Sequence, residues 1–273
     1  MSQPSALRRR LLKGSAGLIA AAACGHAAAA AELRVGINAG VSFSETEEQL
    51  RRRYAEMLDA LSLAVGRRLA FDVVYSDRVT QAVDGAAHDL LLIHTHAALK
   101  AERQAGYQVL GFSDDRRDNT VHFFVRPDSP IQSLADAARS DIGVPSPQSW
   151  ATATARAALR LQSPGRDPLL RPTRHQEVVP LMVELRTVAT GVSRSKALVD
   201  LGVAQQRLRV VHSTVPMPLY ALVAAPRLAP GLAERLRLAL TQPADPRTFD
   251  HTPFKGLAFA PDEAARLRRF FLA

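Results

Sequence analysis

The stretch 89-DLLLIH-94 indicates the fold class of this 273-residue chain. Residues 90–93 are apolar without the alternation of a strand that has one wet face, so both faces of this strand are expected to be covered. Further strand-length runs alternate with longer segments whose apolar residues follow helical spacing. These runs are LRVGIN (33–38), LAFDVVYS (69–76), YQVLGFS (107–113), VHFFVRPDS (121–129), DIGVP (141–145), TVATGVS (187–193) and LRVVHS (208–213). The alternation predicts an α/β protein with a mostly parallel sheet covered by helices on both faces.

The longest helical pattern covers residues 44–65. Ser44, with Glu47 three residues later, predicts a capping box at its N-terminus. Its apolar positions repeat with the 3.6-residue period of an amphipathic helix. They are Leu50, Tyr54, Met57, Leu58, Leu61 and Val65. Near the C-terminus, helices are predicted within 226–242 and from Asp262 onward, whereas a passage rich in Pro and Arg, 163–174, interrupts the pattern.

The first 31 residues have the order of a cleavable export signal. A basic head (residues 8–13) precedes a short apolar run (16–24) and an Ala-rich tail that ends at Ala31. The apolar run is too short to span a bilayer. RRRLLK (8–13) resembles a twin-arginine signal, and an ordinary secretory signal is the alternative. The sequence therefore predicts a periplasmic protein.

Charge and cysteine content exclude several classes of protein. Cys24 is the only cysteine, and a lipid anchor there is the less favoured alternative because AAAC lacks the Leu of a lipoprotein box. Cleavage after Ala31 leaves 242 residues without a thiol, which excludes disulfides and thiol catalysis. It also lowers the formal charge from +9 to +5, since four basic residues and no acidic ones are removed. A mild positive charge suits an anionic ligand. The arginines are dispersed and aromatic residues are few, so nucleic acid is not an expected partner.

Small polar residues follow three of the predicted strands. They occur in NAGVSFS (38–44), HTHA (94–97) and SPQSWAT (146–152). In open α/β sheets, ligands bind at the carboxyl ends of strands, beside helix N-termini that attract anions. The third stretch has two interpretations, because Ser and Thr are also common helix N-caps.

The order of segments resembles the substrate-binding proteins of phosphate/phosphite/phosphonate ABC importers. The resemblance rests on LRVGIN, DLLLIHTHAAL (89–99), FFVRPDSPIQSLADAA (123–138), PMP after LRVVHS, and GLAFAPDEAARLRRF (256–270). It implies a type II periplasmic-binding-protein fold with two α/β lobes joined by two hinge crossings. Residues 32–120 and 208–273 would form lobe I and residues 121–207 lobe II, with VHFFV and LRVVH as the crossings. It also implies a monomer that hands a small anionic ligand to a membrane permease, without catalysis or cofactor.

The resemblance also suggests ligand-binding residues. SPQSWAT corresponds to a family stretch that holds phosphonate oxygens, with Ala151 and Thr152 in place of a Ser and a Gly. His175 lies where the family has a histidine. Family acids that bind an ammonium group are replaced at Ala189 and near Lys196 and Tyr220, which disfavours aminophosphonates. The predicted ligand-binding residues are Ser42, Ser44, His94, Thr95, Ser149, Trp150, Thr152, His175, Lys196 and Tyr220.

Other interpretations stay open at this point. His94 and His96 point the same way if extended, but two histidines do not complete a tetrahedral metal site, so no metal is predicted. Trp150 is expected either in the wall of the cleft or in the core of a lobe. A periplasmic sensor for a membrane-bound kinase or cyclase is an alternative to an importer component. An enzyme on the same fold is a further alternative, although no G-x-S-x-G, H-E-x-x-H or P-loop motif occurs.

Overall fold

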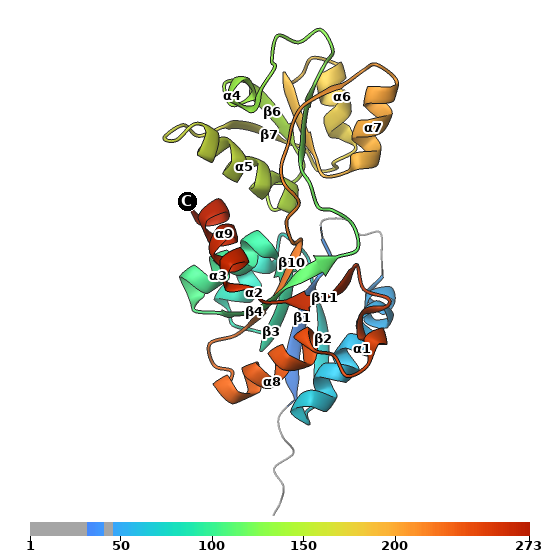
Figure 1. Cartoon of the computed structure of the whole chain (residues 1–273), viewed down its shortest axis with the longest axis vertical. Coiled ribbons are helices and arrows are strands. Elements are labelled where there is room, and N and C mark those ends of the chain that lie inside the picture. The colour runs from blue at the N-terminus through green and yellow to red at the C-terminus, as the bar shows by residue number, and fades with distance from the viewer. Residues whose placement is uncertain (1–31, 41–45) are drawn as a thin grey trace, which may run out of the picture. The chain divides into compact units, whose positions relative to one another are not determined.

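The computed structural model describes residues 32–40 and 46–273. Within it, residues 32–273 contain a six-stranded and a five-stranded sheet (Figure 1). The predicted export signal, Cys24, Ser42 and Ser44 lie outside the described residues.

The six-stranded sheet has the order β11-β4-β10-β3-β1-β2. Strand β1 pairs in parallel with β2 and β3, whereas β10 lies antiparallel between β3 and β4, and β11 is antiparallel to β4. The strands are β1 (Leu33–Asn38), β2 (Leu69–Val74), β3 (Leu90–His94), β4 (Gln108–Asp115), β10 (Tyr220–Ala224) and β11 (Phe254–Ala258).

The five-stranded sheet has the order β7-β6-β8-β5-β9. Strand β6 is parallel to β7 and β8, and β5 is antiparallel to β8 and β9. The strands are β5 (His122–Val125), β6 (Asp141–Val144), β7 (Leu169–Pro172), β8 (Thr190–Ser193) and β9 (Arg209–Ser213). The prediction of a mostly parallel sheet is therefore wrong. Both sheets are mixed, because the chain passes from one sheet to the other after β4 and returns before β10. The first strand after each passage, β5 or β10, is antiparallel to both of its neighbours.

Helices cover both faces of the six-stranded sheet. Helices α1 and α8 pack together on one face, and α3 packs with α2 and α9 on the other. Strand β3 separates the two layers, with Leu90 and Leu92 in one hydrophobic cluster and Leu91 and Ile93 in the other, which confirms that both of its faces are buried. The helices are α1 (Glu47–Val65), α2 (Val79–Asp84), α3 (Thr95–Ala105), α8 (Pro230–Thr241) and α9 (Pro261–Leu272), with a 3₁₀ turn η1 (Pro246–Phe249).

The five-stranded sheet is covered in the same way. Helices α6 and α7 pack on one face, and α5 with the short α4 on the other. Adjacent residues of β5 point to opposite layers, so Phe123 packs with the α5 layer and Phe124 with the α6 and α7 layer. Gly191 in β8 makes room for the Phe124 ring, which a Cβ at this position would meet. The helices are α4 (Leu134–Ala137), α5 (Trp150–Gln162), α6 (Val178–Glu184) and α7 (Lys196–Ala204).

The N-terminus of α1 differs from the sequence prediction. Thr46 is the N-cap, and its hydroxyl accepts a hydrogen bond from the Gln49 backbone N–H while the Gln49 side chain accepts one from the Thr46 N–H. The capping box is therefore Thr46 with Gln49 rather than Ser44 with Glu47. Both pairs fit the sequence rule, and the structure starts the helix two residues later than the Ser44 pair requires.

The two segments that connect the sheets run side by side. The Val121 backbone exchanges two hydrogen bonds with Thr214, one to its hydroxyl (3.0 Å) and one from its N–H (3.0 Å). The Met217 N–H also donates to the Asn119 carbonyl at 3.1 Å. Strand β9 belongs to the five-stranded sheet, so the second change of sheet falls between Ser213 and Tyr220, later than the predicted boundary after Arg207.

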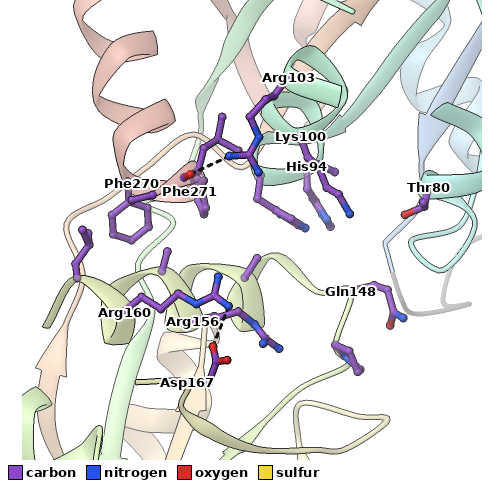
Figure 2. Close-up of a pocket in the computed structure, with 18 of the residues that line it drawn as sticks. Thr80, His94, Lys100, Arg103, Gln148, Arg156, Arg160, Asp167, Phe270 and Phe271 are labelled. Atoms are coloured by element: carbon purple, nitrogen blue, oxygen red, sulfur yellow. Dashed lines mark hydrogen bonds and ion pairs between the residues drawn. The ribbon is translucent and has the colours of Figure 1, made fainter. Parts of the chain in front are cut away.

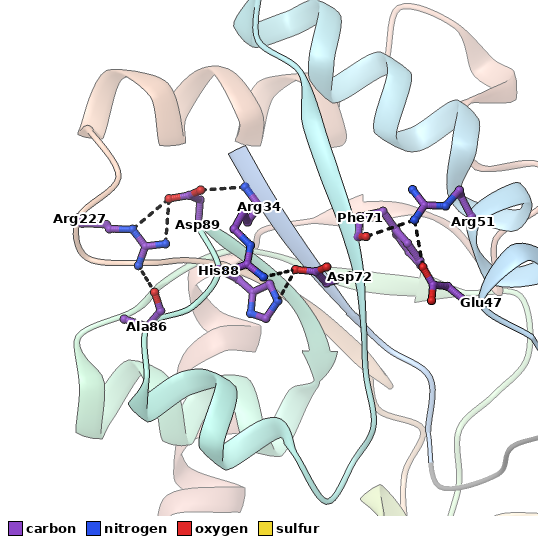
Figure 3. A network of polar contacts seen from close by, with 9 residues as sticks. All are labelled: Arg34, Glu47, Arg51, Phe71, Asp72, Ala86, His88, Asp89 and Arg227. Atoms are coloured by element: carbon purple, nitrogen blue, oxygen red, sulfur yellow. Dashed lines mark hydrogen bonds and ion pairs between the residues drawn. The ribbon is translucent and has the colours of Figure 1, made fainter. Parts of the chain in front are cut away.

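A network of charged groups lies near the amino ends of β1 and β3 in the six-stranded sheet (Figure 3). Asp72 accepts from the Arg34 guanidinium at 2.6 Å and from His88 Nε2 at 3.1 Å. Asp89 accepts from the Arg34 backbone N–H at 2.8 Å and from Arg227 Nε at 3.0 Å. Each carboxylate at this end thus has a cationic partner, which contrasts with the opposite ends of the strands described below.

We expect replacement of Thr214 by Val to destabilise the protein by about 1–3 kcal/mol, because the buried Val121 N–H loses its acceptor. Thr214→Ser keeps the hydroxyl and is the matched control, with stability close to that of the parent protein. Urea unfolding of the two variants measures the difference. Equal stabilities would contradict the assigned role of the hydroxyl.

Candidate functional site

A cleft of about 770 Å³ lies between α5, which covers the five-stranded sheet, and α3 and α9, which cover the six-stranded sheet (Figure 2). Polar side chains from the carboxyl ends of strands line one part of it. Asn38 ends β1, His94 ends β3 and Ser76 follows β2. Gln148 joins them from the turn before α5. This part of the cleft offers hydrogen-bonding groups beside the N-termini of α3 and α5.

The rest of the cleft carries an excess of positive charge. Lys100 and Arg103 project from α3, and Arg156 and Arg160 project from α5 on the opposite side (Figure 2). Arg166, in the loop that follows α5, also lines the cleft. Among the described residues that line the cleft, a single side-chain carboxylate, that of an aspartate in the same loop, opposes these five cations.

Most of this positive charge is not neutralised within the described residues. Arg160 pairs with Asp167 at 3.0 Å. Arg103 donates a hydrogen bond to a backbone carbonyl at the end of α9. This bond fixes the position of the side chain, but a carbonyl carries no net charge and does not neutralise the guanidinium. Across residues 32–40 and 46–273, neither Lys100 nor Arg156 has a carboxylate partner. The cleft is therefore suited to an anion rather than a cation.

Two histidines border the cleft in neutral form. Burial lowers the pKa of His94 well below its usual value, with smaller contributions from His96 and Arg194. Burial and the Lys100 ammonium lower the pKa of His96 to about 4. The two rings stack with centroids 5.9 Å apart, and His94 also contacts the Tyr220 ring at 5.4 Å. Both histidines are therefore hydrogen-bonding groups rather than charges at neutral pH.

Ser149 and Thr152 lie at the N-terminus of α5. The Ser149 hydroxyl caps the helix by accepting from the Thr152 N–H at 3.1 Å. The same hydroxyl lies 2.9 Å from Thr152 Oγ1, which itself donates to the Pro145 carbonyl at 3.1 Å. Neither side chain is among the cleft-lining residues, although the preceding Pro147 and Gln148 are. Trp150 is 2% exposed and packs in the hydrophobic core, which is the second of its two predicted placements.

Two other predicted residues tie the end of β3 to the second crossing. The Thr95 hydroxyl donates to the Pro218 carbonyl at 2.7 Å, and its N–H donates to the Leu219 carbonyl at 3.0 Å. Tyr220 begins β10 directly opposite His94. Thr95 and Tyr220 support the strand that presents His94 to the cleft, and neither lines it.

The structure does not bring His175 and Lys196 to the cleft. His175 is exposed in the turn before α6. Lys196 is exposed at the start of α7, where it pairs with Asp200 one turn later. Ser42 and Ser44 lie outside the described residues. Of the ten predicted residues, His94 is the one that the described structure places in the lining.

None of the five cations that line the cleft is among the ligand-binding residues predicted from the sequence. Lys100 and Arg103 are three residues apart on α3, and Arg156 and Arg160 are four apart on α5, so each pair shares one helix face. Such a face is usually exposed to water, and only the approach of the two helices makes it a shared lining. The one sign of this lining in the sequence is a pair of positive residues on the same face of each of the two helices.

The described residues hold no group of three or more His, Cys, Asp or Glu side chains placed to bind a metal ion. None of the helices in this part of the chain is long and apolar enough to cross a membrane.

Comparisons with known proteins agree with this architecture. The sequence matches the family of phosphonate ABC transporter periplasmic substrate-binding proteins over residues 39–261. No curated protein matches it significantly. Among solved structures, a Xanthomonas citri protein bound to ATP aligns with a TM-score of 0.68 at 18% identity, covering 88% of this chain and 96% of that chain.

Two further solved structures are similar. PhnD1 from Prochlorococcus marinus in complex with methylphosphonate aligns with a TM-score of 0.59 at 14% identity, covering 87% of this chain and 97% of that chain. A binding protein of an ABC phosphonate transporter from Pseudomonas aeruginosa aligns with a TM-score of 0.57 at 16% identity, covering 87% of this chain and 84% of that chain. The predicted type II periplasmic-binding fold is thereby confirmed.

The partly buried His96 predicts loss of stability in acid. Its pKa in the folded state, about 4, lies below the unfolded value of 6.5, so the unfolded chain binds more protons between these values. Stability therefore falls as the pH drops through 6.5. Between pH 7 and pH 5 this one group lowers the free energy of unfolding by about 2 kcal/mol.

Urea unfolding at the two pH values measures this effect. His96→Gln is expected to remove that part of the pH dependence, whereas His175→Gln, at an exposed position, is expected to retain it. A His96→Gln protein that loses as much stability between pH 7 and pH 5 as the parent would disprove the assignment.

Proposed function

The chain belongs to the periplasmic substrate-binding proteins of phosphonate ABC transporters, and from this premise we propose that it captures a small phosphonate-, phosphite- or phosphate-like oxyanion. The family is one of transport proteins rather than enzymes. In this proposal the protein acts as a monomer and passes its ligand to a membrane permease. Two crossings between the sheets permit hinge closure on the ligand.

The observation that carries the proposal is the charge of the cleft. Among the described residues, five cationic side chains line it against one side-chain carboxylate, which is itself paired with Arg160. A cleft lined by one sign of charge concentrates ligands of the opposite sign. Solved relatives bound to methylphosphonate and to ATP, both phosphorus oxyanions, are consistent with such a ligand.

We place the oxyanion at the N-termini of α3 and α5, beside Gln148 and His94. The first turn of a helix has backbone N–H groups without intrahelical acceptors, and the helix dipole favours negative charge there. Among the cleft-lining cations, Lys100 is the nearest in sequence to this end of α3. The hydroxyls of Ser149 and Thr152 order the start of α5, and direct contact of either one with the ligand remains part of the proposal.

An ammonium group on the ligand should weaken binding. Within the described lining it meets Lys100 and the other cations, and the one side-chain carboxylate is already paired. We expect 2-aminoethylphosphonate to bind at least about tenfold more weakly than ethylphosphonate, equivalent to roughly 1.4 kcal/mol. The sequence alone suggested Lys196 for this role, and Lys196 is not among the residues that line the cleft.

Isothermal titration of residues 32–273 with the two compounds measures the difference. Methylphosphonate, phosphite, phosphate and a methylsulfonate complete the panel and identify the preferred oxyanion. Equal affinity for the amino compound and its amine-free analogue would overturn the charge argument. Absence of binding to every oxyanion in the panel would overturn the proposed function.

We also propose that residues 1–31 direct export by the twin-arginine route, on the basis of RRRLLK and the Ala-rich tail. Replacing Arg8 and Arg9 by Lys is then expected to leave the precursor in the cytoplasm, because that route reads the arginine pair. Cell fractionation and immunoblotting follow the precursor, with Arg52→Lys on α1 as a control outside the signal. Normal export of the double variant would exclude the twin-arginine route.

A further inference from the structure

The cleft extends well beyond the place proposed for a small oxyanion. Its far part lies between the later turns of α3 and α5, where Arg103 faces Arg156 and Arg160 across the cleft (Figure 2). We propose that this far part is a second anion subsite and that the natural ligand is an elongated molecule with at least two separated phosphate- or phosphonate-type groups. This inference rests on the proposed function, since it assumes that the first group binds at the helix N-termini.

Within the far subsite, Arg160 pairs with Asp167, whereas Arg156 lacks the pairing found for charges elsewhere in the described part of the protein. Arg156 is half-buried, and across residues 32–40 and 46–273 no acceptor contacts it. Arg156 and Arg160 are four residues apart on one helix face, a spacing at which like charges repel. By contrast, charged residues at the amino ends of the strands pair with one another, as Asp89 does with Arg227. A polyanion would relieve this repulsion and give Arg156 a partner.

The positions of the arginines along α5 determine how long a ligand must be to reach them. At about 1.5 Å per residue, Arg156 lies roughly 9 Å along α5 from Trp150 at the first turn, and Arg160 lies about 15 Å along it. A single-carbon phosphonate held at the helix N-terminus cannot reach these guanidinium groups. A chain of phosphates, or an organic spacer between two acidic groups, can.

Guanidinium groups suit this role better than generic positive charge. The planar guanidinium donates two parallel hydrogen bonds to a phosphate or phosphonate group, which gives orientation as well as attraction. Arg103 is already positioned by its bond to a backbone carbonyl at the end of α9, with an Nη1–O distance of 2.9 Å. It therefore presents its remaining donors from the opposite wall at little further loss of side-chain freedom.

Isothermal titration of residues 32–273 with inorganic triphosphate, inorganic phosphate and methylphosphonate tests the subsite, at one fixed ionic strength near 0.15 M because exposed charges are screened. Triphosphate is expected to bind at least tenfold more tightly than either small anion. Arg156→Gln with Arg160→Gln should weaken triphosphate by more than tenfold, and by at least about tenfold more than it weakens methylphosphonate, which these two arginines attract only through the general field of the cleft. Arg269→Gln on α9 removes an exposed cation outside the cleft lining and should alter neither affinity.

The outcomes separate this inference from the proposed function. If methylphosphonate or phosphate binds and triphosphate binds no more tightly, the second subsite is wrong while the proposed function stands. The subsite is also wrong if the double variant weakens all three anions equally, because the arginines then act only through the general field of the cleft. Tight triphosphate binding by the double variant would also contradict the second subsite. If no anion binds, the proposed function fails first.

Discussion

The insertion of β10 between β3 and β4 is the constraint on which the rest of the structure depends. It pairs with a strand on each side, and Leu222 and Val223 are fully buried. The chain must therefore return to this sheet after it has built the five-stranded one, and the returning segment lies against the departing one at Val121 and Thr214. The same insertion puts Tyr220 against His94 and so fixes the end of β3 at the cleft.

Much of the fold followed from apolar spacing in the sequence. The uninterrupted run of β3 correctly predicted a strand buried on both faces, since its side chains enter two separate cores. Strand β10 escaped prediction because YALVA follows the proline-rich segment before it and is short enough to suit a loop or a helix end. Strand β7 escaped because Leu169–Pro172 is largely exposed at the edge of its sheet and carries no apolar pattern. Pairing with distant strands, rather than local sequence, decides both.

The site was predicted less well than the fold, for a physical reason. One small hydroxyl at a strand end correctly marked the start of a helix, because Ser149 caps α5, whereas Ser44 does not cap α1. However, a hydroxyl that caps a helix and a hydroxyl that binds a ligand occur in the same kind of local sequence, so the sequence does not distinguish the two roles. The cations of α3 and α5 show only a shared helix face in the sequence, because their importance depends on two helices that cover different sheets and line the same space.

The distribution of charge divides the six-stranded sheet into two ends with different roles. At the amino ends of its strands, Arg34 and Arg227 are matched by Asp72 and Asp89, and the group is complete without a ligand. The cleft at the other ends holds cations that the protein does not match. Unmatched charge of one sign disfavours closure of two lobes unless a counter-charge enters, because bringing the like charges of α3 and α5 into a drier space raises their repulsion. In the function proposed above, the residues that attract the anion would thus also make closure depend on its presence, which is the coupling that a carrier handing its ligand to a permease requires.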